Sequence, residues 1–143
     1  MNESESLSHT RWECKYHVTF IPKCRRKVLY LKLREELGAI FKVLAERVDA
    51  RVEEGHLMGD HVHMLLSIPP KHSVSKVMGY IKGKSAIQIA QLSEGRKRNF
   101  LGYHFWARGY HVSTVGRDEA VIRAYIRNQE KEDQRIDQLG LFR

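Results

Sequence analysis

The feature of this chain that most limits its fold is the order in which two hydrophobic periodicities follow one another. Apolar and polar residues alternate, as on a strand with one buried face, over residues 12–21, 50–58, 61–68 and 109–115. Apolar residues recur every three or four positions, as on an amphipathic helix, over residues 29–48, 74–87 and 119–134. The first six segments match the split βαβ order. We therefore expect an α+β fold: a ferredoxin-like antiparallel sheet with helices on one face plus a C-terminal helix.

Length and charge set further bounds. The chain has 143 residues with no linker that divides it, so residues 1–143 are expected to form a single domain. Lys and Arg number 25 against 17 Asp and Glu, and the net charge of +8 favours polyanions such as nucleic acid. No apolar run is long enough for a bilayer, and the N-terminal segment lacks the apolar stretch of a signal peptide. We expect a cytoplasmic protein without a membrane partner.

Two histidines lie close together on the predicted strand 61–68. Side chains alternate along a strand, so His61 and His63 share one face, while Val62 and Met64 share the other and fit a core. Imidazoles at this spacing, about 7 Å apart at Cβ, can converge on one divalent ion. The alternative is a pair of histidines on the solvated face of a sheet, and the pair taken alone favours this alternative.

The last predicted helix offers a possible nucleophile on the apolar stripe that carries Val121, Ile122, Tyr125 and Ile126. Gln129 follows Tyr125 by four residues, so the two side chains point the same way. A tyrosine hydroxyl can act as a nucleophile, and a glutamine carbonyl oxygen can bind a hard metal ion. The alternative is a core aromatic residue followed by a glutamine at the polar edge of the stripe.

Taken together, the two patterns resemble a known family. A His pair flanked by hydrophobic residues on a strand, followed late in the chain by Tyr-x-x-x-Gln on a helix, is similar to the single-tyrosine HUH nucleases. More closely, the chain resembles the TnpA-type HUH transposases of small bacterial insertion sequences, the insertion sequence 200/605 group. The resemblance covers nearly the whole chain and is carried by residues 15–18, 22–28, 60–63, 79–85, 105–110, 113–116 and 125–129.

The resemblance implies a reaction and a set of roles. His61 and His63 would bind a divalent metal, Mg²⁺ or Mn²⁺, with Gln129 completing the site, and Tyr125 would attack a phosphodiester. A 5′-phosphotyrosine intermediate would then allow single-stranded DNA to be cut and rejoined. The family recognises DNA hairpins near element ends and acts as a homodimer, in which the tyrosine helix of one subunit completes the histidine site of the other.

Basic residues near the expected active face are candidates for DNA binding, although each charge run also fits an ordinary solvated surface. They are Lys23, Arg25, Arg26, Lys82, Lys84 and Arg108. Neighbouring aromatic residues could stack on unpaired bases, and we expect at least half of them to be core instead. These aromatic residues are Tyr80, Tyr103, Phe105 and Trp106.

Other protein classes fit the sequence less well. RNA-recognition domains of this fold carry a central strand rich in Gly and aromatic residues, which residues 61–67 lack. With only Cys14 and Cys24, no set of four Cys and His residues has the spacing of a structural zinc site. The alternative function is a domesticated or non-catalytic hairpin-binding protein of the same fold.

Overall fold

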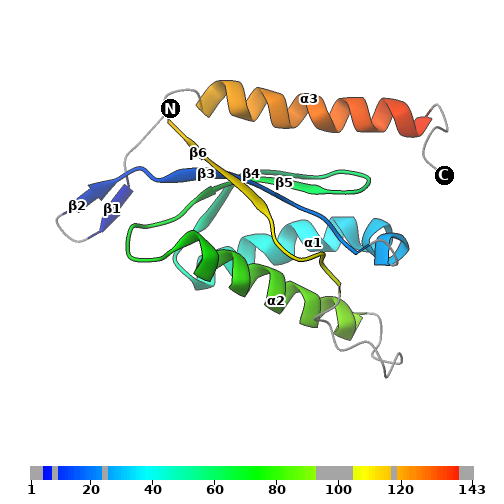
Figure 1. Ribbon diagram of the computed structural model, residues 1–143, viewed down its shortest axis with the longest axis horizontal. Coiled ribbons are helices and arrows are strands. Elements are labelled where there is room, and N and C mark those ends of the chain that lie inside the picture. The colour runs from blue at the N-terminus through cyan, green and yellow to red at the C-terminus, as the bar shows by residue number, and fades with distance from the viewer. Residues whose placement is uncertain (1–4, 8–9, 24–25, 93–104, 117–118, 139–143) are drawn as a thin grey trace.

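The computed structural model describes residues 5–7, 10–23, 26–92, 105–116 and 119–138 (Figure 1). Its main sheet has the strand order β4-β5-β3-β6, and each neighbouring pair is antiparallel. The strands are β3 (Lys15–Phe20), β4 (Arg51–Leu57), β5 (Val62–Ser67) and β6 (His111–Val115). The helices are α1 (Lys27–Arg47), α2 (Val74–Leu92) and α3 (Glu119–Gln138). This topology confirms the predicted ferredoxin-like α+β fold with an added C-terminal helix.

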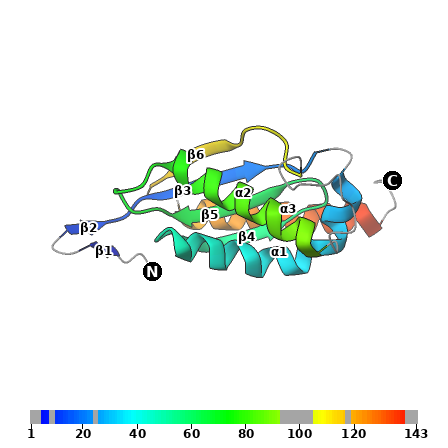
Figure 2. The same cartoon turned by 90° about the horizontal axis from the view of Figure 1, so that it is seen from below.

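Helices cover both faces of the sheet. The connecting helices α1 and α2 lie side by side on one face, whereas α3 lies across the opposite face, where it contacts β4 and β5 (Figures 1 and 2). None of the helices in the described part of the chain is long and apolar enough to cross a membrane.

The N-terminal end differs from the prediction of one strand over residues 12–21. A separate hairpin of β1 (Glu5–Leu7) and β2 (Thr10–Trp12) precedes the main sheet, and β3 begins only at Lys15. Trp12 pairs with Glu5 in this hairpin and not with the main sheet. The alternating pattern runs through both strands, so periodicity could not reveal the break between them.

The hydrophobic core lies between the sheet and the helices α1 and α2. Alternation along the strands directs Val18, Phe20, Val62, Met64 and Leu66 to this inner face, and each is at most 2% exposed. They pack in one cluster with apolar helix residues that include Leu37, Phe41, Leu44, Ile81 and Ile89. Because the core uses one side chain in two along β3 and β5, the alternate side chains remain for the outer face.

Only part of the predicted apolar stripe of α3 is buried. Ile126 is buried, but Val121 is 65% exposed and Tyr125 is 47% exposed. The reason is that α3 lies over the outer face of the sheet, which carries polar side chains, and not over the core. Of the four stripe residues, Ile126 is the one that is fully buried.

Candidate active site

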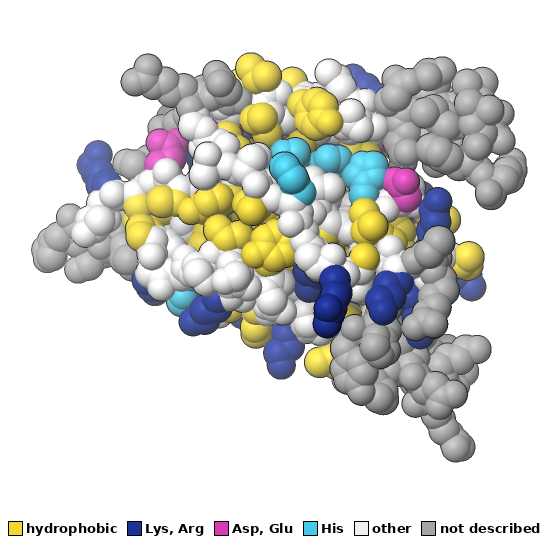
Figure 3. All heavy atoms as spheres, viewed as in Figure 1, with side chains coloured by type: hydrophobic (Ala, Val, Ile, Leu, Met, Phe, Trp, Pro, Cys, Tyr) yellow, Lys and Arg dark blue, Asp and Glu magenta, His cyan; other side chains and the backbone are white. Residues whose placement is uncertain are grey.

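Histidine side chains gather on the outer face of the sheet. In the strand register, Thr19 of β3 lies opposite His63 of β5 on one side and His111 of β6 on the other. His56 of β4 also lies opposite His63, and His17 shares the outer face because it is two residues from Thr19. Figure 3 shows the cluster of exposed histidine side chains on this side of the molecule. The outer face of the sheet therefore carries several imidazole side chains on the side that α3 crosses.

The turn that carries His61 is held by a residue of α1, the helix on the inner face of the sheet. Met58 donates its backbone N–H to the carbonyl oxygen of His61 at 2.8 Å, which closes the β4–β5 turn. The buried Tyr30 of α1 donates its hydroxyl hydrogen to this turn, with the carbonyl oxygens of Met58 and His61 at 2.5 Å and 2.9 Å. A core residue of α1 thereby sets where His61 stands beside the first residue of β5.

His61 and His63 lie together, as the spacing predicts. Their ring centroids are 4.6 Å apart, with the ring planes nearly perpendicular. Nδ1 of His61 lies 2.5 Å from Oδ1 of Asp60, and Nδ1 of His63 lies 2.9 Å from Nε2 of His17 and 3.2 Å from Oγ1 of Thr19. Since Nδ1 is the engaged nitrogen in both rings, Nε2 is the nitrogen left for a ligand.

The protonation state of His63 suits metal binding. Burial, and to a lesser degree the charges of the neighbouring His61, His17 and His56, lower the pKa of His63 to about 4. Burial, and then the charge of His111, also lowers the pKa of His17. Both imidazoles are therefore neutral at pH 7, and a neutral imidazole is the form that binds a metal ion.

Tyr125 lies next to this cluster. Its ring centroid is 6.2 Å from those of both His17 and His63, in each case with the rings edge to face. The structure thus places Tyr125 next to His63 of the same chain, although the two residues are 62 positions apart in the sequence. Nearly half of the tyrosine side chain is exposed, so a substrate can reach it. Gln129 lies one turn further along α3 and is half-buried.

Ion pairs position α3 over the sheet. A β-bulge between Val52 and Glu54 breaks the alternation of β4, and Arg123 of α3 contacts the carboxylates of both Glu53 and Glu54, at 3.5 Å and 3.4 Å. Arg127 adds a second contact to Glu54, at 3.2 Å. The bulge therefore allows two consecutive carboxylates to hold one helix.

Two further polar contacts of α3 lie on either side of Tyr125 along the helix. Lys15 of β3 donates to Glu119, in the first turn of α3, at 3.0 Å, and Arg123 contacts the other oxygen of Glu119 at 2.8 Å. A carboxylate in the first turn also interacts favourably with the helix dipole. Further along the helix, Glu130 contacts Nδ1 of His56. Tyr125 lies between these two contacts.

The donor set fits a divalent metal held by few protein ligands. Among the described residues, no group of three or more His, Cys, Asp or Glu side chains is arranged to hold a metal ion. A metal bound by the two nitrogen atoms of His61 and His63 would thus need additional oxygen ligands, such as Gln129, water or a phosphate. Sites with open positions of this kind are typical of catalytic metals.

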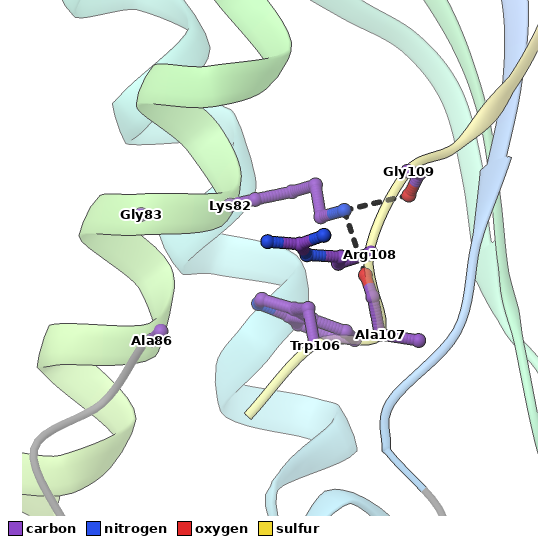
Figure 4. A pocket seen from close by; sticks show the side chains of 7 residues that line it. All are labelled: Lys82, Gly83, Ala86, Trp106, Ala107, Arg108 and Gly109. Atoms are coloured by element: carbon purple, nitrogen blue, oxygen red, sulfur yellow. Dashed lines mark hydrogen bonds between the residues drawn. The ribbon is translucent and has the colours of Figure 1, made fainter. Parts of the chain in front are cut away.

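The predicted DNA-binding residues differ in their surroundings. Lys82 donates to the backbone carbonyl oxygens of Ala107 and Gly109 at 2.9 Å and 2.6 Å (Figure 4). Burial lowers the pKa of Lys82. This lysine holds the segment before β6, whereas Lys84 and Arg108 are exposed and remain candidates for DNA contacts.

The other predicted basic residues lie around the start of α1. Lys23 and Arg26 are half-buried there, and Arg25 lies outside the described residues.

A recess of about 300 Å³ lies beside Lys82, between α2 and the segment before β6. It is lined by Lys82, Gly83, Ala86, Trp106, Ala107, Arg108 and Gly109.

Two of the aromatic residues considered for base stacking belong to the core. Phe105 and Trp106 are buried, and Nε1 of Trp106 donates to Oγ of Ser85 at 2.9 Å. Tyr80 is half-buried against the core, and Tyr103 lies outside the described residues. Phe105 and Trp106 are thus unsuited to stacking on DNA bases.

Sequence reasoning missed His17 as part of the site. Its place on the outer face follows from alternation, but its contact with His63 depends on β3 pairing with β5 in one particular register. A single-residue shift would have turned His17 toward the core. The polar face of the first predicted strand, combined with the predicted ferredoxin-like fold, is the signal that could have found it.

The fold and the site together define a class of protein. A ferredoxin-like sheet with a His-x-His pair, crossed by a helix that presents a tyrosine to that pair, is the arrangement expected of a small DNA transposase. The model of the family described as "Transposase IS200 like" matches residues 10–129. The chain belongs to this family of IS200-like transposases.

Individual relatives agree with this assignment. The chain is 45% identical to the transposase for insertion sequence element IS200 of Salmonella typhimurium, over 99% of this chain and 93% of the relative. It is 28% identical to the ISDra2 transposase TnpA of Deinococcus radiodurans, over 85% of this chain and 88% of the relative.

Solved structures share the fold. A candidate transposase from Deinococcus radiodurans R1 aligns with a TM-score of 0.66 and 26% identity, over 90% of this chain and 98% of that chain. A REP-associated tyrosine transposase bound to a REP hairpin aligns with a TM-score of 0.59 over 88% of this chain and 70% of that chain. At 16% identity, this second likeness is one of fold alone.

Proposed function

We propose that this transposase cuts and rejoins single-stranded DNA through Tyr125, at a metal site formed by His61 and His63. The observation that carries the proposal is the position of Tyr125, whose ring lies 6.2 Å from that of His63 on the exposed side of the sheet. A nucleophile beside the neutral imidazoles of His17 and His63 suits phosphoryl transfer, in which positioning and charge neutralisation supply most of the catalysis. Acting on chromosomal DNA, the protein would work in the cytoplasm.

The reaction conserves the phosphodiester energy. The hydroxyl oxygen of Tyr125 would attack the scissile phosphorus, forming a tyrosine–phosphate ester, while the bond to the 3′ oxygen breaks and that oxygen leaves as a 3′-hydroxyl. The tyrosine proton passes to solvent or to a basic group during the attack. A second 3′-hydroxyl can attack the same ester and release Tyr125, so strands are rejoined without ATP.

A divalent metal would be bound by Nε2 of His61 and of His63, with Gln129 as the third protein ligand. Mg²⁺ or Mn²⁺, when bound, would polarise the scissile phosphate and neutralise its charge. We expect Mn²⁺ to bind more tightly than Mg²⁺ because two of the ligands are nitrogen and Mg²⁺ prefers oxygen. Gln129 belongs to the same helix as Tyr125, so movement of α3 would change the nucleophile and the metal site together.

Subterminal DNA hairpins are the proposed recognition element. The net charge of +8 supports a polyanionic substrate, and a solved protein of the same fold is described as bound to a REP hairpin. Lys84 and Arg108 offer exposed positive charge on this chain. Lys23, Arg25 and Arg26 complete the proposed set near the start of α1.

We also propose a homodimer. β6 lies at one edge of the main sheet, and within the described part of the chain it pairs with β3 alone. An open edge can extend into the sheet of a second copy. Tyr125 faces the histidines of its own chain here, so shared active sites would require α3 to move to the partner. Ion pairs such as Arg127–Glu54 could form equally well between two copies.

The test is a denaturing gel with single-stranded DNA from an element end, incubated with protein and Mn²⁺. A 3′-end label should become linked to protein, whereas a 5′-end label should appear on a shortened free strand. Tyr125→Phe and His61→Ala should each abolish the adduct, as should EDTA, while Tyr80→Phe serves as a matched tyrosine control. An adduct that survives in Tyr125→Phe would refute the assigned nucleophile, and hairpin binding without any adduct would favour the non-catalytic alternative.

A further inference from the structure

We propose that His17 is a positioning residue that fixes the tautomer and the ring orientation of His63, so that Nε2 of His63 is presented to the metal. The inference rests on the proposed metal site, and it assigns a role to a residue outside the His-x-His and Tyr-x-x-x-Gln patterns. His17 lies in the middle of β3, one strand away from His63, and it does not itself need to touch metal or DNA.

The geometry of the pair is that of an in-plane hydrogen bond. Nε2 of His17 lies 2.9 Å from Nδ1 of His63, the ring planes are 14° apart, and the ring centroids are 5.1 Å apart. The centroid separation is close to the nitrogen separation plus the two ring radii, so both nitrogens lie near the line between the ring centres. Face-to-face stacking would hold the nitrogens further apart than this. The N–H and the lone pair of imidazole lie in the ring plane, so the arrangement suits a strong hydrogen bond.

This bond selects one tautomer of His63 when a metal is bound. A metal on Nε2 requires that nitrogen to be unprotonated, so the single proton of the neutral ring must lie on Nδ1. Nδ1 then donates to Nε2 of His17, which accepts with its lone pair and holds its own proton on Nδ1. Hydrogen bonds of this kind to metal-binding histidines orient the ring and increase its strength as a ligand.

Two neighbouring contacts bear on the assignment. Oγ1 of Thr19 lies 3.2 Å from the same nitrogen of His63 and is a second, longer acceptor. His61 has a different partner, the carboxylate of Asp60, at 2.5 Å from its Nδ1. Each histidine of the pair thus has its own acceptor for Nδ1–H: Asp60 for His61 and His17 for His63. Of these two acceptors, His17 is the one that lies on a strand of the sheet.

The experiment measures Mn²⁺ binding to the full-length protein without DNA, by the loss of the free Mn²⁺ signal in electron paramagnetic resonance. His17→Phe keeps a ring but removes the hydrogen bond, whereas His17→Gln places an amide near the position of Nε2. We expect His17→Phe to weaken Mn²⁺ binding by about 10–100-fold, His17→Gln to restore most of it, and Thr19→Val to have a smaller effect. Circular dichroism confirms that each variant is folded.

The outcomes separate the two proposals. If His17→Phe binds Mn²⁺ like the wild type while His63→Ala does not bind it, the role of His17 is refuted and the metal site stands. Equal losses in His17→Phe and His17→Gln would also refute it, since a hydrogen bond would then not be what matters. If His63→Ala binds Mn²⁺ as the wild type does, the metal site itself is refuted, and the role of His17 falls with it.

Discussion

Lys15 and Glu119 form a buried ion pair that joins the central strand β3 to the first turn of α3. Nζ of Lys15 lies 3.0 Å from Oε1 of Glu119, and the two side chains are only 7% and 8% exposed. The pair links segments 104 residues apart. Tyr125 follows Glu119 by less than two turns of the same helix, so this contact helps to determine where the tyrosine lies over the histidines.

Glu119→Gln is expected to lower stability at neutral pH and to lose that effect in acid. Burial opposes ionisation of Glu119, but hydrogen bonds from Lys15 and Arg123 outweigh it and lower the pKa of the carboxyl below its ordinary value. The ionised carboxylate therefore contributes fully above the ordinary pKa, and its contribution disappears as pH falls through the lowered pKa. We expect a loss of about 1–3 kcal/mol at pH 7, measured by urea unfolding.

The same measurement repeated at acidic pH checks the sign. The difference between wild type and Glu119→Gln should shrink as pH falls, because protonation makes the wild-type side chain resemble glutamine. A difference that stays constant between pH 7 and pH 3 would show that the effect of the substitution is unrelated to the charge of Glu119.

Glu54→Gln should loosen α3 without unfolding the domain. Glu54 contacts both Arg123 and Arg127, and each pair is only partly shielded from solvent. The expected cost is on the order of 1 kcal/mol and should decrease in high salt, which already screens these pairs in the wild type. Amide hydrogen exchange in α3 reports the change, with Glu36→Gln on the exposed side of α1 as the control.

Replacement by Met should affect stability at Lys82 and DNA binding at Lys84. Lys82→Met removes two hydrogen bonds to backbone carbonyl oxygens, so we expect a stability loss of about 1.5–3 kcal/mol. Lys84→Met should change stability by less than about 0.5 kcal/mol, because Lys84 is exposed.

DNA binding provides the second half of this comparison. If Lys84 contacts a phosphate, Lys84→Met should weaken hairpin binding and reduce the slope of log affinity against log salt by about one. An unchanged slope would remove Lys84 from the proposed DNA-binding set.

A mixture of two inactive variants tests whether active sites are shared. Tyr125→Phe supplies intact histidines and His61→Ala supplies an intact tyrosine. If α3 exchanges within a homodimer, an equal mixture should recover about a quarter of wild-type cleavage, since half of the dimers are mixed and each has one working site. Sites that stay within one chain, as Tyr125 and His63 stand here, would give no recovery.

Local patterns predicted much of this protein. Alternation along residues 61–68 correctly placed His61 and His63 together and Val62 and Met64 in the core, because side-chain direction on a strand depends only on position. Helical spacing likewise located α3 and Tyr125. The same spacing did not predict that Val121 is exposed, since it describes a stripe but not the surface that the stripe meets.

Taken by itself, the sequence determined the ferredoxin-like element order, the His-x-His pair and the tyrosine helix, because periodicity and residue chemistry are local properties. Only the tertiary structure decided that His17 contacts His63, that Lys15 anchors Glu119, and that Lys82 donates to backbone carbonyl oxygens. These contacts depend on strand register and on the meeting of distant segments. Both are settled when the whole chain packs, and no window of neighbouring residues contains them.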